Sequence, residues 1–177
     1  MTWADPGACS EPPAQQADAL HACPGGQLGI VTTAGGHRLV ALHAVAAGQL
    51  ILRIDGEVTS QPSRHSVQIG TNAHIAPTAA APGRNPLDHG YWRYLNHSCE
   101  PNAWLRGHEL IALRNIAANH DVTFDYNTTE WDMAVPFACH CGSARCLGTV
   151  RGFAHLSPAQ RDRLQGAAPH LLARLAP

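Results

Sequence analysis

The sequence contains no lysine, because all twelve residues counted as Lys or Arg are arginine. An excess of one charge is also missing, since these twelve arginines stand against thirteen acidic residues. Proteins that bind nucleic acid by neutralising phosphates, or that bind anionic membranes, usually carry a basic excess. No apolar run approaches the roughly 20 residues of a membrane-spanning helix. We therefore expect no direct nucleic-acid binding and no membrane partner.

The sequence also lacks the features of a secretory signal. Its opening residues, MTWADPGACSEPP, have neither a basic start nor an apolar stretch, so we expect a cytoplasmic protein. Thiols stay reduced in the cytosol, where clustered cysteines more often bind a metal than form disulfides. Apolar residues are plentiful: 45% of 177 residues are hydrophobic, which is enough for the core of one domain.

From Gly26 onward, short β-prone segments follow one another, separated by Gly, Pro or Asn. After an N-terminal arm at residues 1–25, which we expect to be flexible, the sequence predicts strands at 28–33, 38–44, 50–54, 66–69, 74–76 and 122–126. A hairpin is predicted from 103–105 and 109–113, and a loop at 79–88. Near the end, Ser157 is a candidate N-cap, Pro158 suits the first helical position, and Pro169 is expected to break the helix in two. Strands dominate, so we predict a mainly β fold.

Three cysteines lie close together at Cys139, Cys141 and Cys146. Zinc takes four tetrahedral ligands, and thiolates at this spacing can surround it on a loop that turns at Gly142. Buried cysteines without a metal, or with one disulfide, are the weaker interpretation. Candidates for a fourth ligand are Cys99, His140, Cys9 and Cys23. Cys99 is the better choice because it lies in a compact polar motif, whereas His140 would have to point back past its own backbone. Cys9 and Cys23 fall in the arm and are interpreted as spare thiols.

Residues 93–102, with the sequence RYLNHSCEPN, closely resemble the Asn-His-Ser-Cys motif of SET-domain protein lysine methyltransferases. Residues 122–126 (VTFDY) resemble the second signature of that family. The spacing of the three clustered cysteines resembles its post-SET zinc element, in which Cys99 would supply the fourth thiolate. The resemblance covers about residues 26–153 and rests on three motifs in the right order.

This resemblance implies a SET-type (β-clip) fold of small curved sheets, with a knot-like C-terminal threading and a short C-terminal helical segment. The SET domain would span residues 26–136, the post-SET zinc element 137–153, and a C-terminal helical extension 154–177. The implied activity is methyl transfer from S-adenosylmethionine to the side-chain amine of lysine in a protein or peptide. One zinc ion would be structural, because four thiolates leave no position open for water. A chain without lysine could not modify its own side chains.

The resemblance also assigns individual residues. Tyr126 matches the catalytic tyrosine and would orient the lysine nitrogen near the transferring methyl, without acting as the general base. Phe124 implies room for more than one methyl. The lysine channel would be walled by Phe124, Tyr126, Trp131 and Phe137, although Trp131 and Phe137 are equally well explained as core residues. The cofactor would contact Gly36, His37, Arg38, Arg93, Tyr94, Asn96, His97 and Leu147, the last of these packing on the adenine.

Two positions depart from the family pattern. The family usually opens with a Gly-x-Gly turn, whereas this sequence has Gly36-His37-Arg38. The Cβ of Arg38 could obstruct a left-handed turn or the close approach of the cofactor, or its guanidinium could bind the methionine carboxylate of the cofactor. Before the Phe-Asp-Tyr segment, Asn119 replaces a usual Gly, and asparagine tolerates positive φ better than most residues.

Two further functional interpretations remain open. A catalytically silent SET module could act as a peptide-binding or cofactor-binding scaffold, and the Arg38 departure is its main support. A zinc-ribbon nucleic-acid binder is disfavoured by the near-neutral charge and by the lack of interleaved aromatic and basic residues. The leucine-bearing C-terminal segment could pack on the core or form a homodimer.

Overall fold

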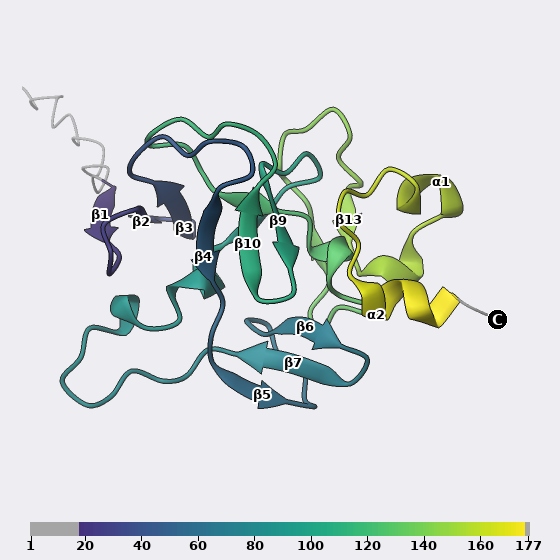
Figure 1. The fold of residues 1–177 in the computed structure, drawn as a ribbon, viewed down its shortest axis with the longest axis horizontal. Helices are drawn as coiled ribbons and strands as arrows, with labels where there is room; N and C mark the ends of the chain where they lie inside the picture. Colours follow the sequence, from purple (N-terminus) through teal and green to yellow (C-terminus); the bar gives the residue numbers. More distant parts are fainter. Residues whose placement is uncertain (1–17, 176–177) are drawn as a thin grey trace, which may run out of the picture.

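The computed structural model describes residues 18–175, which form small β-sheets and short helices around a main apolar core (Figure 1). The mainly β fold class predicted from the sequence is confirmed. Aliphatic side chains of the sheets supply most of this core, together with Trp92 and Phe124. A smaller apolar cluster, built around Phe153, Leu156 and Leu171, lies in the C-terminal segment.

The first sheet has the order β1 (Ala19–Ala22), β2 (Leu28–Thr33), β3 (Gly36–Ala41). Strand β1 falls inside the segment predicted to be a flexible arm, and this part of the prediction was wrong because β1 pairs with β2 along its length. Cys23 follows β1 and is 3% exposed. Its amide donates to the Leu28 carbonyl, so Cys23 closes the turn and belongs to the core. Cys9 lies outside the described residues.

The second sheet places β10 (Glu109–Ala112) between β4 (Leu50–Arg53) and β9 (Ala103–Arg106). The predicted hairpin is confirmed as β9–β10. Gly107 at its tip has a φ of 61°, a left-handed conformation that glycine adopts without a steric penalty. The third sheet, at the bottom of Figure 1, has the order β5 (Glu57–Thr59), β7 (Ala73–Ala76), β6 (Val67–Gly70). The predicted loop at 79–88 ends in a 3-10 turn, η1 (Pro86–Asp88), and a second turn, η2 (Tyr91–Tyr94), follows.

The two signature segments lie side by side in the fold. Strand β8 (Asn96–His97) pairs in parallel with β11 (Thr123–Phe124). Parallel strands cannot be joined by a tight turn, and here β9 and β10 occupy the connection. The strand predicted to run to residue 126 stops at 124, because the Asp125 side chain accepts a hydrogen bond from the Asn127 amide and caps the turn η3 (Tyr126–Thr128).

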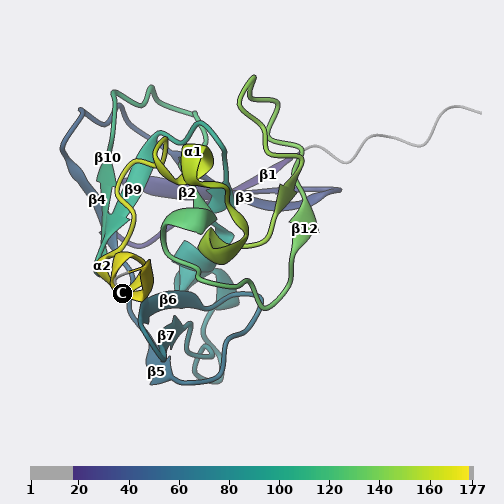
Figure 2. The ribbon, with the colours of Figure 1, turned by 90° about the vertical axis from the view of Figure 1, so that its right-hand side faces the viewer.

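The last part of the chain contains one hairpin and several short helical turns. The hairpin joins β12 (Phe137–Ala138) to β13 (Thr149–Val150), and η4 (Phe153–His155), α1 (Pro158–Arg161), α2 (Pro169–Leu172) and η5 (Ala173–Leu175) follow. Figure 2 shows this segment facing the viewer. Ser157 and Gln160 form a reciprocal capping box, which confirms the predicted helix start. Pro169 begins α2 instead of breaking one long helix. No helix between residues 18 and 175 is long and apolar enough to cross a membrane.

Candidate functional site

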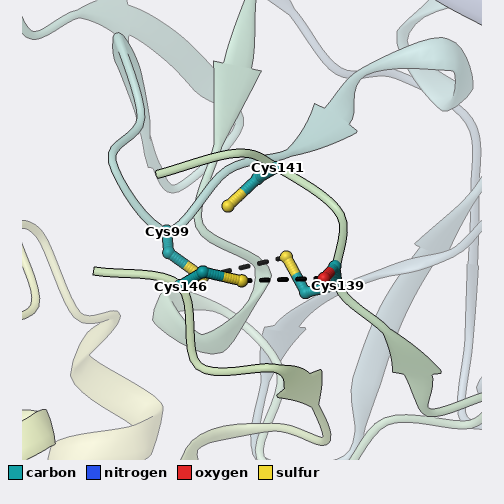
Figure 3. A group of neighbouring side chains, drawn as sticks. All are labelled: Cys99, Cys139, Cys141 and Cys146. Carbon is teal, nitrogen blue, oxygen red and sulfur yellow. Dashed lines mark hydrogen bonds between the residues drawn. The ribbon is translucent and has the colours of Figure 1, made fainter. Parts of the chain in front are cut away.

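Four thiols converge from separate parts of the sequence, as Figure 3 shows. Cys99 follows β8, Cys139 follows β12, and Cys141 and Cys146 lie in the turn between β12 and β13. Their sulfur atoms all lie within 4.8 Å of one another, and the Cys99 and Cys139 sulfurs are 3.9 Å apart. Zn–S bonds of about 2.3 Å in a tetrahedron place the sulfurs roughly 3.8 Å apart. The four predicted ligands therefore fit a zinc ion, and the exposed His140 is not among them.

The protonation of these thiols agrees with a cation site. Burial raises the pKa of Cys99, and burial likewise raises the pKa of Cys139 to about 11. Burial also opposes ionisation of Cys141, but hydrogen bonds from the backbone of Cys99 and Ser143 outweigh it and lower the pKa of Cys141 to about 7. The Cys141 thiolate therefore forms readily, whereas Cys99 and Cys139 need a bound cation to ionise near neutral pH.

Beside the cysteine cluster lies a large cleft of about 1470 Å³. It is lined by most of the residues predicted for the cofactor, namely Gly36, His37, Arg38, Arg93, Tyr94, Asn96 and His97. Leu147 is the exception. Its side chain packs against the C-terminal apolar cluster and does not line the cleft, so the structure corrects this assignment. The reason is local, because the Leu147 amide faces the Cys99 sulfur at 3.4 Å while the apolar side chain turns toward Phe153 and its neighbours.

The cleft is rich in positive charge although the chain is nearly neutral. Its lining includes Arg38, Arg64, Arg93 and Arg114, against the acidic side chains of Glu100 and Asp121. Arg38 and Asp121 form an ion pair. A ligand that carries a carboxylate is therefore favoured in this cleft.

Arg38 does not occupy a left-handed turn. It lies within β3 opposite Val31, and among the described non-glycine residues only Asn119 has a positive φ, of 64°. The turn before β3 lies at Ala34 and Gly35, and the positive φ falls on Gly36, the first residue of the strand, at 128°. A strained left-handed turn at Arg38 is therefore excluded, and Asn119 adopts the positive φ predicted for it. Asn96 ties the same turn to β8, since its side-chain amide donates to the His37 carbonyl at 3.3 Å.

A second, small pocket of about 50 Å³ lies next to the cleft. Phe124 and Tyr126 line it, as predicted for the lysine channel, together with Leu95 and Glu130. Tyr126 lines both the pocket and the cleft. Its hydroxyl donates to the Leu95 carbonyl at 2.5 Å, and its ring lies 4.8 Å from that of Phe124, measured between centroids. The phenol is therefore held in a fixed position where the two spaces meet.

The remaining two predicted channel residues separate. Phe137 lines the cleft, with its ring centroid 6.0 Å from that of Tyr126. Trp131 lines neither space, which corrects its assignment to the channel. Its ring packs on Phe153 at 6.1 Å and lies under the guanidinium of Arg174 at 4.9 Å. The C-terminal segment covers Trp131, so the alternative of a core residue is correct for it.

His97 connects the cysteine cluster with Tyr126. Burial lowers the pKa of this histidine to about 4, so the imidazole is neutral near pH 7. Its Nδ1 accepts a hydrogen bond from the Tyr126 amide at 3.2 Å, which leaves the proton on Nε2. Nε2 lies 3.2 Å from the Cys99 sulfur. One buried side chain therefore contacts both the proposed metal ligand and the residue between the two cavities.

Several lining residues carried no recognisable signal in the sequence. Glu130 lies four residues after Tyr126 in a stretch that looks like a polar turn, yet it is only 7% exposed. Arg64 and His65 come from a segment without a motif and reach both cavities, as does Met133. Sequence motifs identify site residues that lie within them. These four residues lie outside the motifs and reach the cavities through long-range packing.

The family model described as the SET domain matches residues 36–127, which is just over half of the chain. The chain belongs to the SET domain family. Among curated relatives, the methyltransferase flvH of Aspergillus flavus is 34% identical over 125 residues, covering 68% of this chain and 62% of the relative. A histone-lysine N-methyltransferase of Yarrowia lipolytica, described as H3 lysine-36 specific, is 31% identical over 144 residues and covers 70% of this chain but 18% of its own length.

The family assignment also agrees with a solved fold. The crystal structure of KRYPTONITE in complex with mCHG DNA and SAH superimposes with a TM-score of 0.50 at 22% identity, covering 67% of this SET-domain chain and 27% of that chain. This likeness supports the fold alone. The chain spans less than two thirds of the length of these relatives.

Proposed function

We propose that this SET-domain chain transfers a methyl group from S-adenosylmethionine to the side-chain amine of lysine in a protein or peptide. The observation that carries the proposal is the placement of Tyr126, which lines both the large cleft and the small pocket. A cofactor in one space and an amine in the other would meet at this phenol. Such an arrangement would allow the in-line geometry that methyl transfer requires.

The residues of the chain would divide the work between the two spaces. When bound, S-adenosylmethionine supplies an electrophilic methyl on a sulfonium. Asn96 and His97 on β8 would hold the adenosine part in the cleft, and Arg38 or Arg93 would bind the methionine carboxylate by charge-assisted hydrogen bonds. In the pocket, Phe124 and Tyr126 would exclude water and align the amine. Phe124 adds no hydroxyl, which leaves room for more than one methyl.

Cys99, Cys139, Cys141 and Cys146 would hold one structural zinc ion, and residues 137–153 would form the post-SET element around it. Phe137, Ala138 and Cys139 line the cleft, so fixing this segment would complete one wall of the cofactor site. We also propose a cytoplasmic location, because a site of four reduced thiolates fits a reducing compartment.

The proposal is tested by calorimetric binding of S-adenosylmethionine to zinc-loaded protein, followed by transfer of a radiolabelled methyl group to lysine-bearing peptides. Micromolar binding with transfer to the peptide would support it. Because the chain has no lysine side chain to label, background from self-methylation is small. Absence of cofactor binding by folded, zinc-loaded protein would contradict the proposal.

A second candidate is a silent SET module that binds a peptide. The observation that favours it is the Arg38–Asp121 ion pair, which occupies a cleft wall where the family usually has glycine. Arg38→Gly separates the two candidates. In an enzyme that uses Arg38 the change weakens cofactor binding, whereas in a module with a blocked cleft it creates binding that the wild type lacks.

A further inference from the structure

The small pocket contains one buried acid that neither the sequence motifs nor the proposed roles above explain. Glu130 lines the pocket together with Phe124 and Tyr126, and it is 7% exposed. Among the described residues, no arginine or histidine forms an ion pair with it. A buried carboxylate without a cationic partner is costly and is seldom found without a use.

One carboxylate oxygen is fully engaged and the other is available. Oε1 accepts a hydrogen bond from the backbone amide of Gln68 at 2.7 Å and lies 3.4 Å from the Thr129 hydroxyl, and these contacts fix the side chain. Oε2 takes part in no hydrogen bond among the described residues. The only enclosed side-chain nitrogen or oxygen without a partner in residues 18–175 is Nδ1 of His74, so Oε2 is not enclosed. Because Glu130 lines the pocket, we infer that this free oxygen faces it.

The carboxylate and the phenol between the two cavities also affect each other. Burial is the main cause that raises the pKa of Tyr126, and the negative charge of Glu130 adds to it. Burial raises the pKa of Glu130 itself to about 7, against the hydrogen bonds from Gln68 and Thr129. Near neutral pH this acid can therefore both bind a cation and accept a proton.

We propose that Glu130 binds the ammonium of the methyl acceptor in the small pocket and takes one proton from it before transfer. The inference rests on the proposed function. In the first step one N–H bond of R–NH3⁺ breaks, and the carboxylate becomes a carboxylic acid, leaving R–NH2. The amine lone pair then forms the new N–C bond, the methyl–sulfur bond breaks, and its electron pair stays on sulfur. The product leaves as R–NH2CH3⁺, and Glu130 returns its proton to solvent.

Other ionisable groups around Glu130 define the controls. Four of them line the same pocket: Arg64 and His65 before β6, Arg93 in η2 and Tyr126 in η3. Three more lie beyond the strand β6: His74 in β7, His170 in α2 and Arg174 in η5. His65 is the histidine among the groups that line the pocket, and burial lowers its pKa below the usual value. A His65→Gln variant separates its titration from that of Glu130.

The test uses the zinc-loaded full chain and two probes of equal length, n-butylamine and n-butanol, whose affinities are measured by ligand-observed NMR with and without S-adenosylhomocysteine. At pH 8 the wild type should prefer the ammonium by about tenfold or more, as expected for a charge-assisted hydrogen bond. Glu130→Gln keeps an acceptor for the Gln68 amide and should lose this preference. Glu57→Gln, an exposed glutamate of β5 outside both cavities, should keep it.

The pH dependence supplies a readout that a structural role would not produce. Amine affinity of the wild type and of His65→Gln should fall as the pH drops below about 7, and that of Glu130→Gln should not. In the transfer assay, Glu130→Gln should lower kcat by about 100-fold at pH 8, in the range of a lost proton acceptor. If the Glu130 variant does not fold, the wild-type and His65→Gln titrations alone decide.

The outcomes are distinct. The inference is overturned if wild type and Glu130→Gln prefer the ammonium equally, or if the wild type shows no preference. Methyl transfer is then tested only by the transfer assay. If the preference for the ammonium depends on Glu130 but no methyl is transferred from S-adenosylmethionine, Glu130 is a cation-binding residue and the proposed function is wrong. Preference with unchanged transfer in Glu130→Gln removes the proton-accepting role.

Discussion

Replacing Glu130 by glutamine should stabilise the folded protein at alkaline pH and do so less as the pH falls. Burial raises the pKa of this carboxyl from 4.5 to about 7 in the folded state. Between these two values the folded protein holds a proton that the unfolded chain has lost, so the stability of the wild type decreases as pH rises through this window. At 1.36 kcal/mol per pKa unit, the loss approaches about 3 kcal/mol above pH 8.

The measurement is urea unfolding of zinc-loaded wild type and Glu130→Gln at several pH values between 5.5 and 8.5. The gain in unfolding free energy of the variant should rise from about 1.4 kcal/mol at pH 5.5 to about 3 kcal/mol at pH 8.5 and then level off. Asp125 is also buried, with a pKa raised to about 6, but it is present in both proteins and cancels in the difference.

A pH-independent offset added to this pH-dependent difference would only reflect the exchange of one hydrogen-bond acceptor for another. The reasoning is refuted if the difference in stability does not change with pH, or if it decreases as the pH rises. A difference that does not change with pH would mean that Glu130 ionises in the folded protein as it does in water, and a difference that decreases would mean that the fold stabilises its carboxylate.

Three further perturbations test other parts of the structure. Tyr126→Phe removes the hydroxyl that donates to Leu95 and should lower methyl transfer by about 100-fold with cofactor affinity by calorimetry nearly unchanged. Cys139→Ser removes one of four converging thiols, so zinc measured by mass spectrometry should fall well below one ion per chain, and full occupancy would contradict the site. Leu171→Ala should cost about 3 kcal/mol in urea unfolding because the side chain is fully buried, whereas Leu172→Ala, which is 52% exposed, should change stability by less than about 0.5 kcal/mol.

Local patterns in the sequence predicted the elements whose signals are themselves local. The hairpin around Gly107 and the helix start at Ser157 were predicted because turn and cap residues act within a few positions. Cys99 was grouped with the other three cysteines because a family motif includes it, and the structure brings its sulfur next to theirs although it lies far from them in sequence.

Positions decided by distant packing were not predicted. Strand β1 exists because it adds to the edge of β2, and its own residues, Ala19–Ala22, carry no strong strand signal. Trp131 comes shortly after the Phe-Asp-Tyr segment and Leu147 directly after Cys146, but the C-terminal segment beyond these motifs packs against both side chains. Glu130 resembles a surface acid in sequence, and only the fold of β6 over it, through the Gln68 amide, buries it.

The short stretch from Asn96 to Cys99 belongs to two sites at once, since β8 lines the cleft and Cys99 is one of the four thiols. Binding of a metal at the four thiols would therefore change the free-energy cost of ordering the cleft, and binding in the cleft would change the cost of ordering the thiols. Thermodynamic reciprocity requires that any factor by which the metal tightens cofactor binding is also the factor by which the cofactor tightens metal binding. In the proposed enzyme, a chelator would then act as an inhibitor that the cofactor opposes.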